Sequence, residues 1–139
     1  MSETASASVS AEGTTARSVI VVGYSASAEG RAALERALSE ADLRGSRLVV
    51  VHTAPDEDIA NLTEQLESSG VAYDVKSAGD ALDPADELLR AADAADAEII
   101  VIGLRRRSPV GKLLLGSNAQ RVLLDAACPV LAVKAATDA

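Results

Sequence analysis

The sequence predicts a three-layer, doubly wound α/β domain, in which a five-stranded parallel β-sheet lies between helices. Short runs of β-branched apolar residues alternate along the chain with longer segments of helical periodicity. Most of these runs are apolar nearly throughout, which is typical of strands buried on both faces of a parallel sheet. The segments between them are long enough to form the right-handed helical crossovers that join parallel strands.

Five predicted strands alternate with four predicted helices. The strands are expected at residues 19–22, 47–51, 71–76, 99–102 and 129–133. In the third of these, Val71, Tyr73 and Val75 point to one side, so we expect an edge strand with one face in water. The fifth begins with Pro129, which a strand accepts at its first position.

Start and stop residues delimit the helices. Ser27 can cap the first helix, and Gly45 can end it. The second is predicted from apolar residues at helical spacing in the segment before the third strand. Asp83 followed by Pro84 is a cap and a first-turn proline for the third. Residues 117–120, Ser-Asn-Ala-Gln, have the pattern of a capping box at the start of the fourth.

The length of 139 residues fits one domain, which we predict at residues 18–134. Residues 1–17 are small and polar without periodicity, so we expect a disordered N-terminal tail, and residues 135–139 are predicted to form a C-terminal tail. A single cysteine, Cys128, and a start without an apolar signal-peptide region lead us to expect a reduced, cytoplasmic protein.

Composition and charge exclude several classes of partner. The net charge of −8 repels phosphate backbones at long range, which argues against nucleic-acid binding. Two tyrosines without Phe or Trp cannot provide a base-stacking surface. No apolar stretch approaches the roughly 18 residues of a membrane span, and one Cys with one His excludes a zinc site of ordinary composition. We expect no nucleic acid, membrane or metal.

The loop after the fourth strand, residues 103–115, carries the strongest indication of chemistry. Ligands of open parallel sheets bind at the carboxyl ends of the strands, where the winding reverses. Three arginines and one lysine lie within eight consecutive residues of this loop, although the chain is acidic overall. Gly116 and Ser117 then open a helix, whose first N–H groups can hold an anion. These features favour a phosphate site; a solvated cation cluster beside an ordinary helix cap is the alternative.

No catalytic residue is predicted. The segment before the fourth helix is not a Walker A loop, because Leu113 replaces the required Ser or Thr and Arg106 stands at the first glycine. A nucleophile elbow is also missing. The single histidine, His52, ends an apolar strand, where a packed, hydrogen-bonded side chain is the favoured interpretation.

Residues 18–134 resemble the universal stress protein family. Residues 20–27 are similar to the first strand and turn of the family, and residues 51–53 to the end of its second strand. The most specific similarity lies at 103–117 and 127–131, which resemble the nucleotide loop and the last strand. On this basis we predict an adenine nucleotide α-hydrolase-like fold with strand order 3-2-1-4-5.

The chain resembles the ATP-binding branch of that family, with departures. The branch is marked by a glycine, two residues, a second glycine, nine residues, and a third glycine followed by Ser or Thr. Gly103, Gly116 and Ser117 match this pattern, and Arg106 stands at the second glycine. In the first turn, Ser25 replaces the usual Asp, and the next residue is alanine where family members often have glycine (position 26).

The resemblance implies a site for ATP or another adenine nucleotide. Family members use the residue at position 25 to contact the nucleoside and the backbone at Thr53 to contact the base. The predicted nucleotide-binding residues are Gly23, Ser25, Thr53, Gly103, Arg106, Gly116, Ser117 and Asn118. Ser25 lacks the negative charge of Asp, and losing one charged hydrogen bond costs about 1.5–3 kcal/mol. We therefore expect weaker or altered binding rather than none.

Two functions stay open at this point. The first is a non-enzymatic stress-response regulator that senses an adenine nucleotide, and the residues that match the motif favour it. The second is a dimeric interaction module that binds no nucleotide, and the departures from the motif favour it. A hydrolase ranks third, because no general base can be named. In either case the resemblance implies a homodimer through the last strand, residues 129–133; the sequence names no other protein partner.

Overall fold

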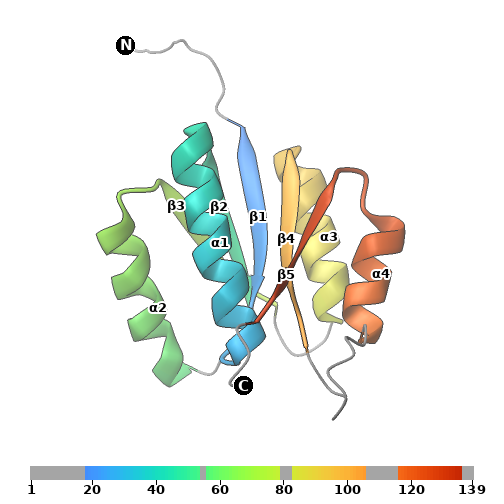
Figure 1. Cartoon of the computed structure of the whole chain (residues 1–139), viewed down its shortest axis with the longest axis horizontal. Coiled ribbons are helices and arrows are strands. Elements are labelled where there is room, and N and C mark those ends of the chain that lie inside the picture. The colour runs from blue at the N-terminus through green and yellow to red at the C-terminus, as the bar shows by residue number, and fades with distance from the viewer. Residues whose placement is uncertain (1–17, 54–55, 79–82, 106–115, 136–139) are drawn as a thin grey trace.

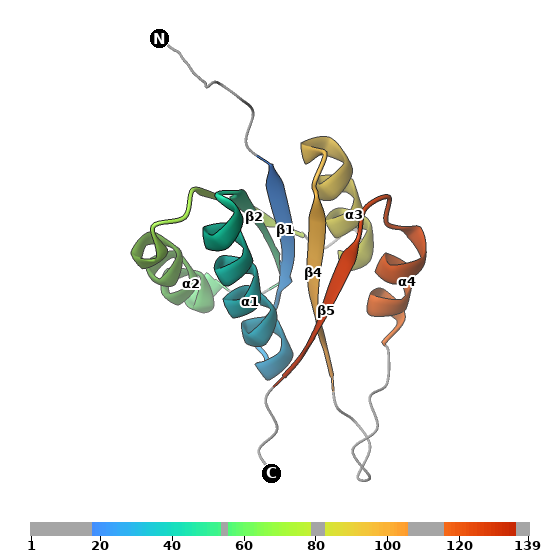
Figure 2. The same ribbon diagram turned by 45° about the horizontal axis from the view of Figure 1, so that its top comes forward.

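Five parallel strands form one sheet in the computed structural model, in the order β3-β2-β1-β4-β5 (Figure 1). The elements along the chain are β1 (Val19–Tyr24), α1 (Ala28–Arg44), β2 (Arg47–His52), α2 (Asp56–Ser69), β3 (Tyr73–Ser77), α3 (Pro84–Ala95), β4 (Ile99–Leu104), α4 (Ser117–Asp125) and β5 (Val130–Lys134). Helices α1 and α2 cover one face of the sheet, and α3 and α4 cover the other (Figure 2). The predicted three-layer class and strand order are confirmed.

The structure describes residues 18–53, 56–78, 83–105 and 116–135, and for residues 56–58 it describes the backbone alone. The predicted N-terminal tail lies outside these ranges, as does the predicted C-terminal tail apart from its first residue. Arg106, one of the predicted site residues, also lies outside them.

The sheet is centred on β1, which pairs with β2 along its whole length and with β4 on its other side. The first, second and fourth strands extend one or two residues beyond their predicted ends, through Tyr24, His52 and Leu104, because the parallel ladders continue past the apolar runs. All carboxyl ends point to the lower edge in Figure 1, where α1, α3 and α4 begin. Strand ends and helix starts are thus gathered at one edge of the sheet.

Two apolar layers hold the helices to the sheet. On one face, Leu34 of α1 and Leu62 of α2 pack against β1 and β2, and each is 1% exposed. On the other face, Leu88 of α3 and Val122 of α4 pack against β4 side chains such as Ile100. Strands β1, β2 and β4 contribute to both layers, so their side chains are apolar in succession, as the continuous runs predicted.

Three predicted helix boundaries are confirmed. Ser27 caps α1 by accepting a hydrogen bond from the Gly30 N–H at 3.1 Å. The same helix ends at Gly45, whose φ of 66° is a left-handed conformation that glycine adopts without strain. Asp83 caps α3, with Pro84 in the first turn.

Arg121 joins the two helices that cover the second face. Its guanidinium lies against Asp83 and Asp86 at the start of α3, and against Asp125 in its own helix. The side chain is 42% exposed, so each single pair is screened by water. Because one cation serves three carboxylates, its removal would also leave those carboxylates to repel one another.

A second network lies at the amino ends of the strands. Glu98 pairs with Arg44 at 3.0 Å and accepts a hydrogen bond from the Ser46 hydroxyl at 2.9 Å. Hydrogen bonds from the hydroxyls of Ser18 and Ser46 and from Arg44 hold the pKa of Glu98 below its usual range, against a smaller opposing effect of burial. This carboxylate therefore ties the starts of β1, β2 and β4 together.

Candidate functional site

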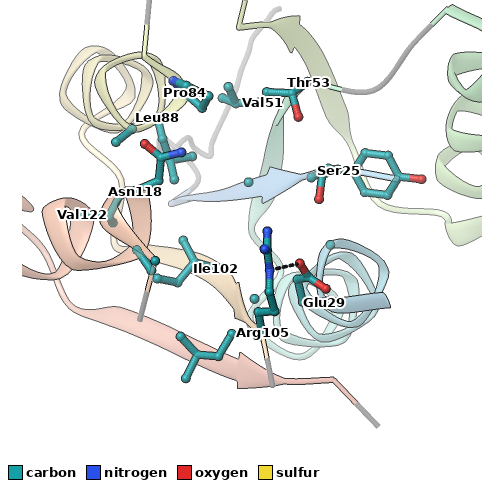
Figure 3. Close-up of a pocket in the computed structure, with 18 of the residues that line it drawn as sticks. Ser25, Glu29, Val51, Thr53, Pro84, Leu88, Ile102, Arg105, Asn118 and Val122 are labelled. Carbon is teal, nitrogen blue, oxygen red and sulfur yellow. Dashed lines mark hydrogen bonds and ion pairs between the residues drawn. The ribbon is translucent and has the colours of Figure 1, made fainter. Parts of the chain in front are cut away.

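A cavity of about 500 Å³ opens at the carboxyl ends of β1 and β4 (Figure 3). The winding of the sheet reverses between these two strands, because the chain passes from β1 to β2 and β3 on one side and later to β4 and β5 on the other. Residues near the N-termini of α1, α3 and α4 complete the wall. The cavity therefore lies where ligands of open parallel sheets bind.

Seven of the eight predicted site residues line this cavity. They are Gly23, Ser25, Thr53, Gly103, Gly116, Ser117 and Asn118. The eighth, Arg106, lies outside the described residues. Folding has thus gathered the turn after β1, the end of β2, the end of β4 and the start of α4 around one space. That these residues bind a nucleotide stays a prediction.

The start of α4 differs from the predicted capping box. Gly116, not Ser117, is the cap residue, with the extended backbone of φ −69° and ψ 167°, and no side-chain cap hydrogen bond is found among the described residues. The Gln120 N–H donates to the Gly116 carbonyl at 3.0 Å, which closes the first turn one residue earlier than predicted. The N–H groups of residues 117–119 have no partner within the helix, and these residues line the cavity. An anion there would meet these donors and the positive end of the helix dipole.

Two glycines of the predicted motif have different structural roles. A Cβ atom on Gly103 would lie 2.1 Å from the carbonyl oxygen of Glu29, because the end of β4 packs directly on the first turn of α1. A Cβ atom on Gly116 would meet none of the described atoms within 4 Å, and the backbone there suits any residue. Packing among the described residues therefore accounts for glycine at 103 and not at 116, where the free space faces the cavity.

The turn after β1 is folded closely onto α1. The hydroxyls of Ser25 and Ser27 share a hydrogen bond of 2.8 Å, so Ser25 supports the residue that caps the helix. A Cβ atom on Gly30 would lie 2.2 Å from the Ser25 carbonyl oxygen, which makes Gly30 a second close-packing glycine. Gly30 was not among the predicted site residues, and an isolated glycine inside a predicted helix was its only signal.

Two charged residues of the cavity were also missed, Glu29 and Arg105. The Arg105 Nε–H donates to Glu29 Oε2 at 3.3 Å, the dashed line in Figure 3. Arg105 is the first member of the cation run noted in the sequence, and that run was its only indication. Glu29 is one of many helix carboxylates, and only the packing of α1 on β4 brings it to the cavity.

Apolar side chains form another part of the wall. Val51 of β2, Leu88 of α3, Ile102 of β4 and Val122 of α4 all line the cavity (Figure 3). Gly23 leaves room for this packing, because a Cβ atom there would lie 3.3 Å from Leu88 Cδ2. An apolar surface with a few polar groups around it is typical of a site for a small organic molecule.

His52 and Cys128 are not among the described residues that line the cavity. His52 is buried as predicted, but its Nδ1 atom has no hydrogen-bond partner among the described residues, so the predicted hydrogen bond is not found at that atom. Cys128 is half-buried, and burial raises the pKa of its thiol. Within the described ranges, no three His, Cys, Asp or Glu side chains gather to hold a metal ion, and no helix is long and apolar enough to cross a membrane.

Comparison with known proteins decides the family. The sequence model of the Universal stress protein family matches residues 17–78 and 56–134. A universal stress protein of Mycolicibacterium smegmatis is 46% identical over 127 residues, which span 84% of this chain and 97% of that protein. The chain belongs to the universal stress protein family.

Solved structures of universal stress proteins share its architecture. One from Archaeoglobus fulgidus is 34% identical with a TM-score of 0.67, and the match covers 86% of this chain and 100% of that chain. Another from the same organism, in complex with dAMP, is 30% identical with a TM-score of 0.62 and covers 86% of this chain and 98% of that chain. The adenine nucleotide α-hydrolase-like fold expected of a universal stress protein is confirmed.

Proposed function

We propose that the chain is a stress-response regulatory protein that binds an adenine nucleotide, ATP in the first place, in the cavity between β1 and β4. The observation that carries this proposal is the start of α4 at the cavity wall, where the described residues provide no side-chain cap and no packing contact that would require glycine at 116. The dAMP complex of the Archaeoglobus fulgidus relative supports adenine as the base. We assign this role to the cytoplasm as part of the proposal.

The proposed orientation puts the phosphates at the start of α4 and the nucleoside toward β1 and β2. Gly116, Ser117 and Asn118 supply backbone donors and the helix dipole for the phosphates. Ser25 and Thr53 lie across the cavity from Asn118 in Figure 3 and offer hydroxyls to the nucleoside. ATP is favoured as ligand because the cation run of the adjacent loop suits a polyphosphate.

We propose binding without catalysis. The described wall of the cavity holds one carboxylate, Glu29, and it is engaged by Arg105 at 3.3 Å. The Arg105 guanidinium thus occupies the carboxylate that would have to act as general base. Slow turnover of ATP would contradict this part of the proposal, and it is checked by following phosphate release from a nucleotide-saturated sample.

Calorimetric titration with ATP, ADP and AMP tests nucleotide binding. Gly116→Val puts an isopropyl group into the free space at the start of α4 and should weaken ATP binding about tenfold or more, the equivalent of losing a hydrogen bond to a charged group. Ala127→Val places the same side chain at an exposed position that is not among the cavity residues and should leave binding unchanged. Adenine nucleotide that co-purifies with the protein would also be visible as absorbance near 260 nm. The signal would stand out because the chain has no Trp and absorbs weakly itself.

The alternative is a dimeric interaction module that binds no nucleotide. The hydrogen bond between Ser25 and Ser27 favours this alternative, because Ser25 then supports the helix cap rather than a ligand. If wild type shows no heat with any of the three nucleotides at millimolar concentration, the nucleotide proposal fails and the interaction module takes its place.

We propose a homodimer through the outer edge of β5, residues 129–133. The strand lies at the edge of the sheet, and its half-buried residues Val130 to Val133 carry no charge. The Pro129 carbonyl accepts from the Ile100 N–H, so the backbone groups of alternate residues starting at 129 face β4, and those of Val130 and Ala132 face outward. Outward backbone N–H and C=O groups at a sheet edge can form hydrogen bonds with the same strand of a second copy.

Proline substitution tests the dimer at a chosen position. Ala132→Pro removes an outward N–H and should convert the dimer to a monomer that still melts cooperatively. Leu131→Pro removes an N–H that faces β4 and should lower the melting temperature instead. Size-exclusion chromatography with light scattering measures the mass; a wild-type monomer at high micromolar concentration contradicts the proposal.

A further inference from the structure

Glu29 and Arg105 are the charged side chains among the described residues that line the cavity, and they are paired with each other. The two come from different elements, Glu29 from the first turn of α1 and Arg105 from the position after β4. Their side chains differ in exposure, 21% for the carboxylate and 61% for the guanidinium. Figure 3 shows the pair among the residues that line the cavity, together with Ser25 and Asn118.

Packing holds the carboxylate more firmly than the guanidinium. The backbone of Glu29 lies against Gly103, where even a Cβ atom would come within 2.1 Å of the Glu29 carbonyl oxygen. The carboxylate also lies in the first turn of α1, where the helix dipole favours a negative charge. Arg105 has a long, mostly exposed side chain, so it can turn to another partner while Glu29 stays in place.

We propose that Glu29 is a specificity-determining residue. It forms an ion pair with Arg105 until a phosphate displaces it, and it thereby sets how much phosphate charge the cavity accepts. This inference rests on the proposed nucleotide binding. A phosphate that reaches Arg105 has to take the guanidinium from Glu29, and it brings its own negative charge close to that carboxylate. Both effects oppose binding. The ion pair is separated once, when a phosphate reaches Arg105, whereas the repulsion by Glu29 grows with the number of phosphates.

A ligand without phosphate meets neither effect. Adenosine leaves the ion pair intact and adds no charge beside Glu29, whereas ATP brings the largest charge of the series. Glu29 therefore shifts the preference of the cavity away from triphosphates and toward nucleotides of lower charge. Arg105 is the partner through which most of this shift acts, and the remainder is direct repulsion between Glu29 and the phosphates.

Glu29→Gln tests this inference because it keeps the size of the side chain and removes its charge. Adenosine, AMP, ADP and ATP are titrated by calorimetry at one fixed, low ionic strength, with and without Arg105→Gln. The control Glu40→Gln removes a carboxylate that is also paired with arginines in α1, about 16 Å further along the helix axis. Urea unfolding of each variant confirms that the protein used in the titrations is folded.

We expect Glu29→Gln to tighten ATP binding about threefold to tenfold and adenosine binding by less than about twofold, with ADP and AMP between them. In the Arg105→Gln background the gain for ATP should shrink, and in 0.5 M salt it should shrink further. Glu40→Gln should leave the order and spacing of the four affinities unchanged.

Two results would overturn the inference, and they differ from each other. If the four ligands bind and Glu29→Gln changes all affinities by the same factor or not at all, Glu29 does not set the preference, while nucleotide binding itself stands. If none of the four ligands binds wild type or any variant, the proposed nucleotide site falls and this role of Glu29 falls with it.

Discussion

Gly103→Ala is the substitution that most directly tests how the cavity is built. The glycine follows the buried part of β4, residues 100–102, and the new methyl group would point at the backbone of α1. Its carbon would lie 2.1 Å from the carbonyl oxygen of Glu29 and 2.6 Å from the carbonyl carbon. Backbone atoms cannot turn aside as a flexible side chain does, so the strand end and the helix start have to separate.

The separation needed is about 1.3 Å, to bring the closest pair to the 3.4 Å of ordinary contact. Helix α1 cannot shift by that amount without disturbing its buried face, which includes Ala33, Leu34 and Ala37. Overpacking of a close-packed interior costs about 1–3 kcal/mol, and we expect the upper end because both partners are backbone. For a domain of this size that corresponds to a fall in melting temperature of about 10 °C.

Urea and thermal unfolding measure this loss, and Gly116→Ala is the matched control. Both glycines line the same cavity and both receive one methyl group, but a Cβ atom on Gly116 meets none of the described atoms within 4 Å. Gly116→Ala should lower the free energy of unfolding by less than about 1 kcal/mol. The loss expected is that of the cap alone, because alanine is a poorer cap residue than glycine. Equal stability of Gly103→Ala and wild type, or equal losses in the two variants, would refute the packing argument.

Two further predictions concern the ion-pair networks. Glu98 has a pKa held below its usual value in the folded protein, so its contribution to stability is present above pH 4.5 and is lost as pH falls through the lowered folded pKa. The stability difference between wild type and Glu98→Gln, measured by urea unfolding from pH 7 to pH 3, should therefore narrow at the acid end; a constant difference would contradict this. Arg121→Gln should lower the free energy of unfolding at low salt and lower it less in 1 M NaCl, because salt screens the repulsion left among its three aspartate neighbours. A loss that does not depend on salt would show that Arg121 acts through packing instead.

Local patterns were enough to predict the elements and the edge of the sheet where the site lies. The central strands β1, β2 and β4 were found because strands buried on both faces have to be apolar at consecutive positions. The end of α1 at Gly45 and the start of α3 at Asp83 were found because a left-handed backbone and a side-chain cap each require particular residue types. Once the elements alternate in this way, general rules of winding place ligands at the carboxyl ends of the strands.

The start of α4 shows where local patterns fail. Residues 117–120 match the sequence pattern of a capping box with Ser117 as cap residue. In the structure, Ser117 is the first helical residue and Gly116 is the cap residue. A capping pattern predicts that a helix starts nearby, and the backbone conformation of one residue decides where. The conformation of Gly116 leaves the first N–H groups at the cavity without a side-chain cap, which the sequence pattern alone had not indicated.

By itself, then, the sequence determined the layers of this universal stress protein and the order of its elements, because those depend on periodicity and on capping residues. Its resemblance to the family pointed to seven of the residues around the cavity. Only the tertiary structure decided that Gly103 is needed for the contact with α1, and that Glu29 and Arg105 meet at the cavity wall. These contacts join segments that are distant along the chain. Their distances are set by how closely helix α1 packs on strand β4, a quantity that no local pattern of residues contains.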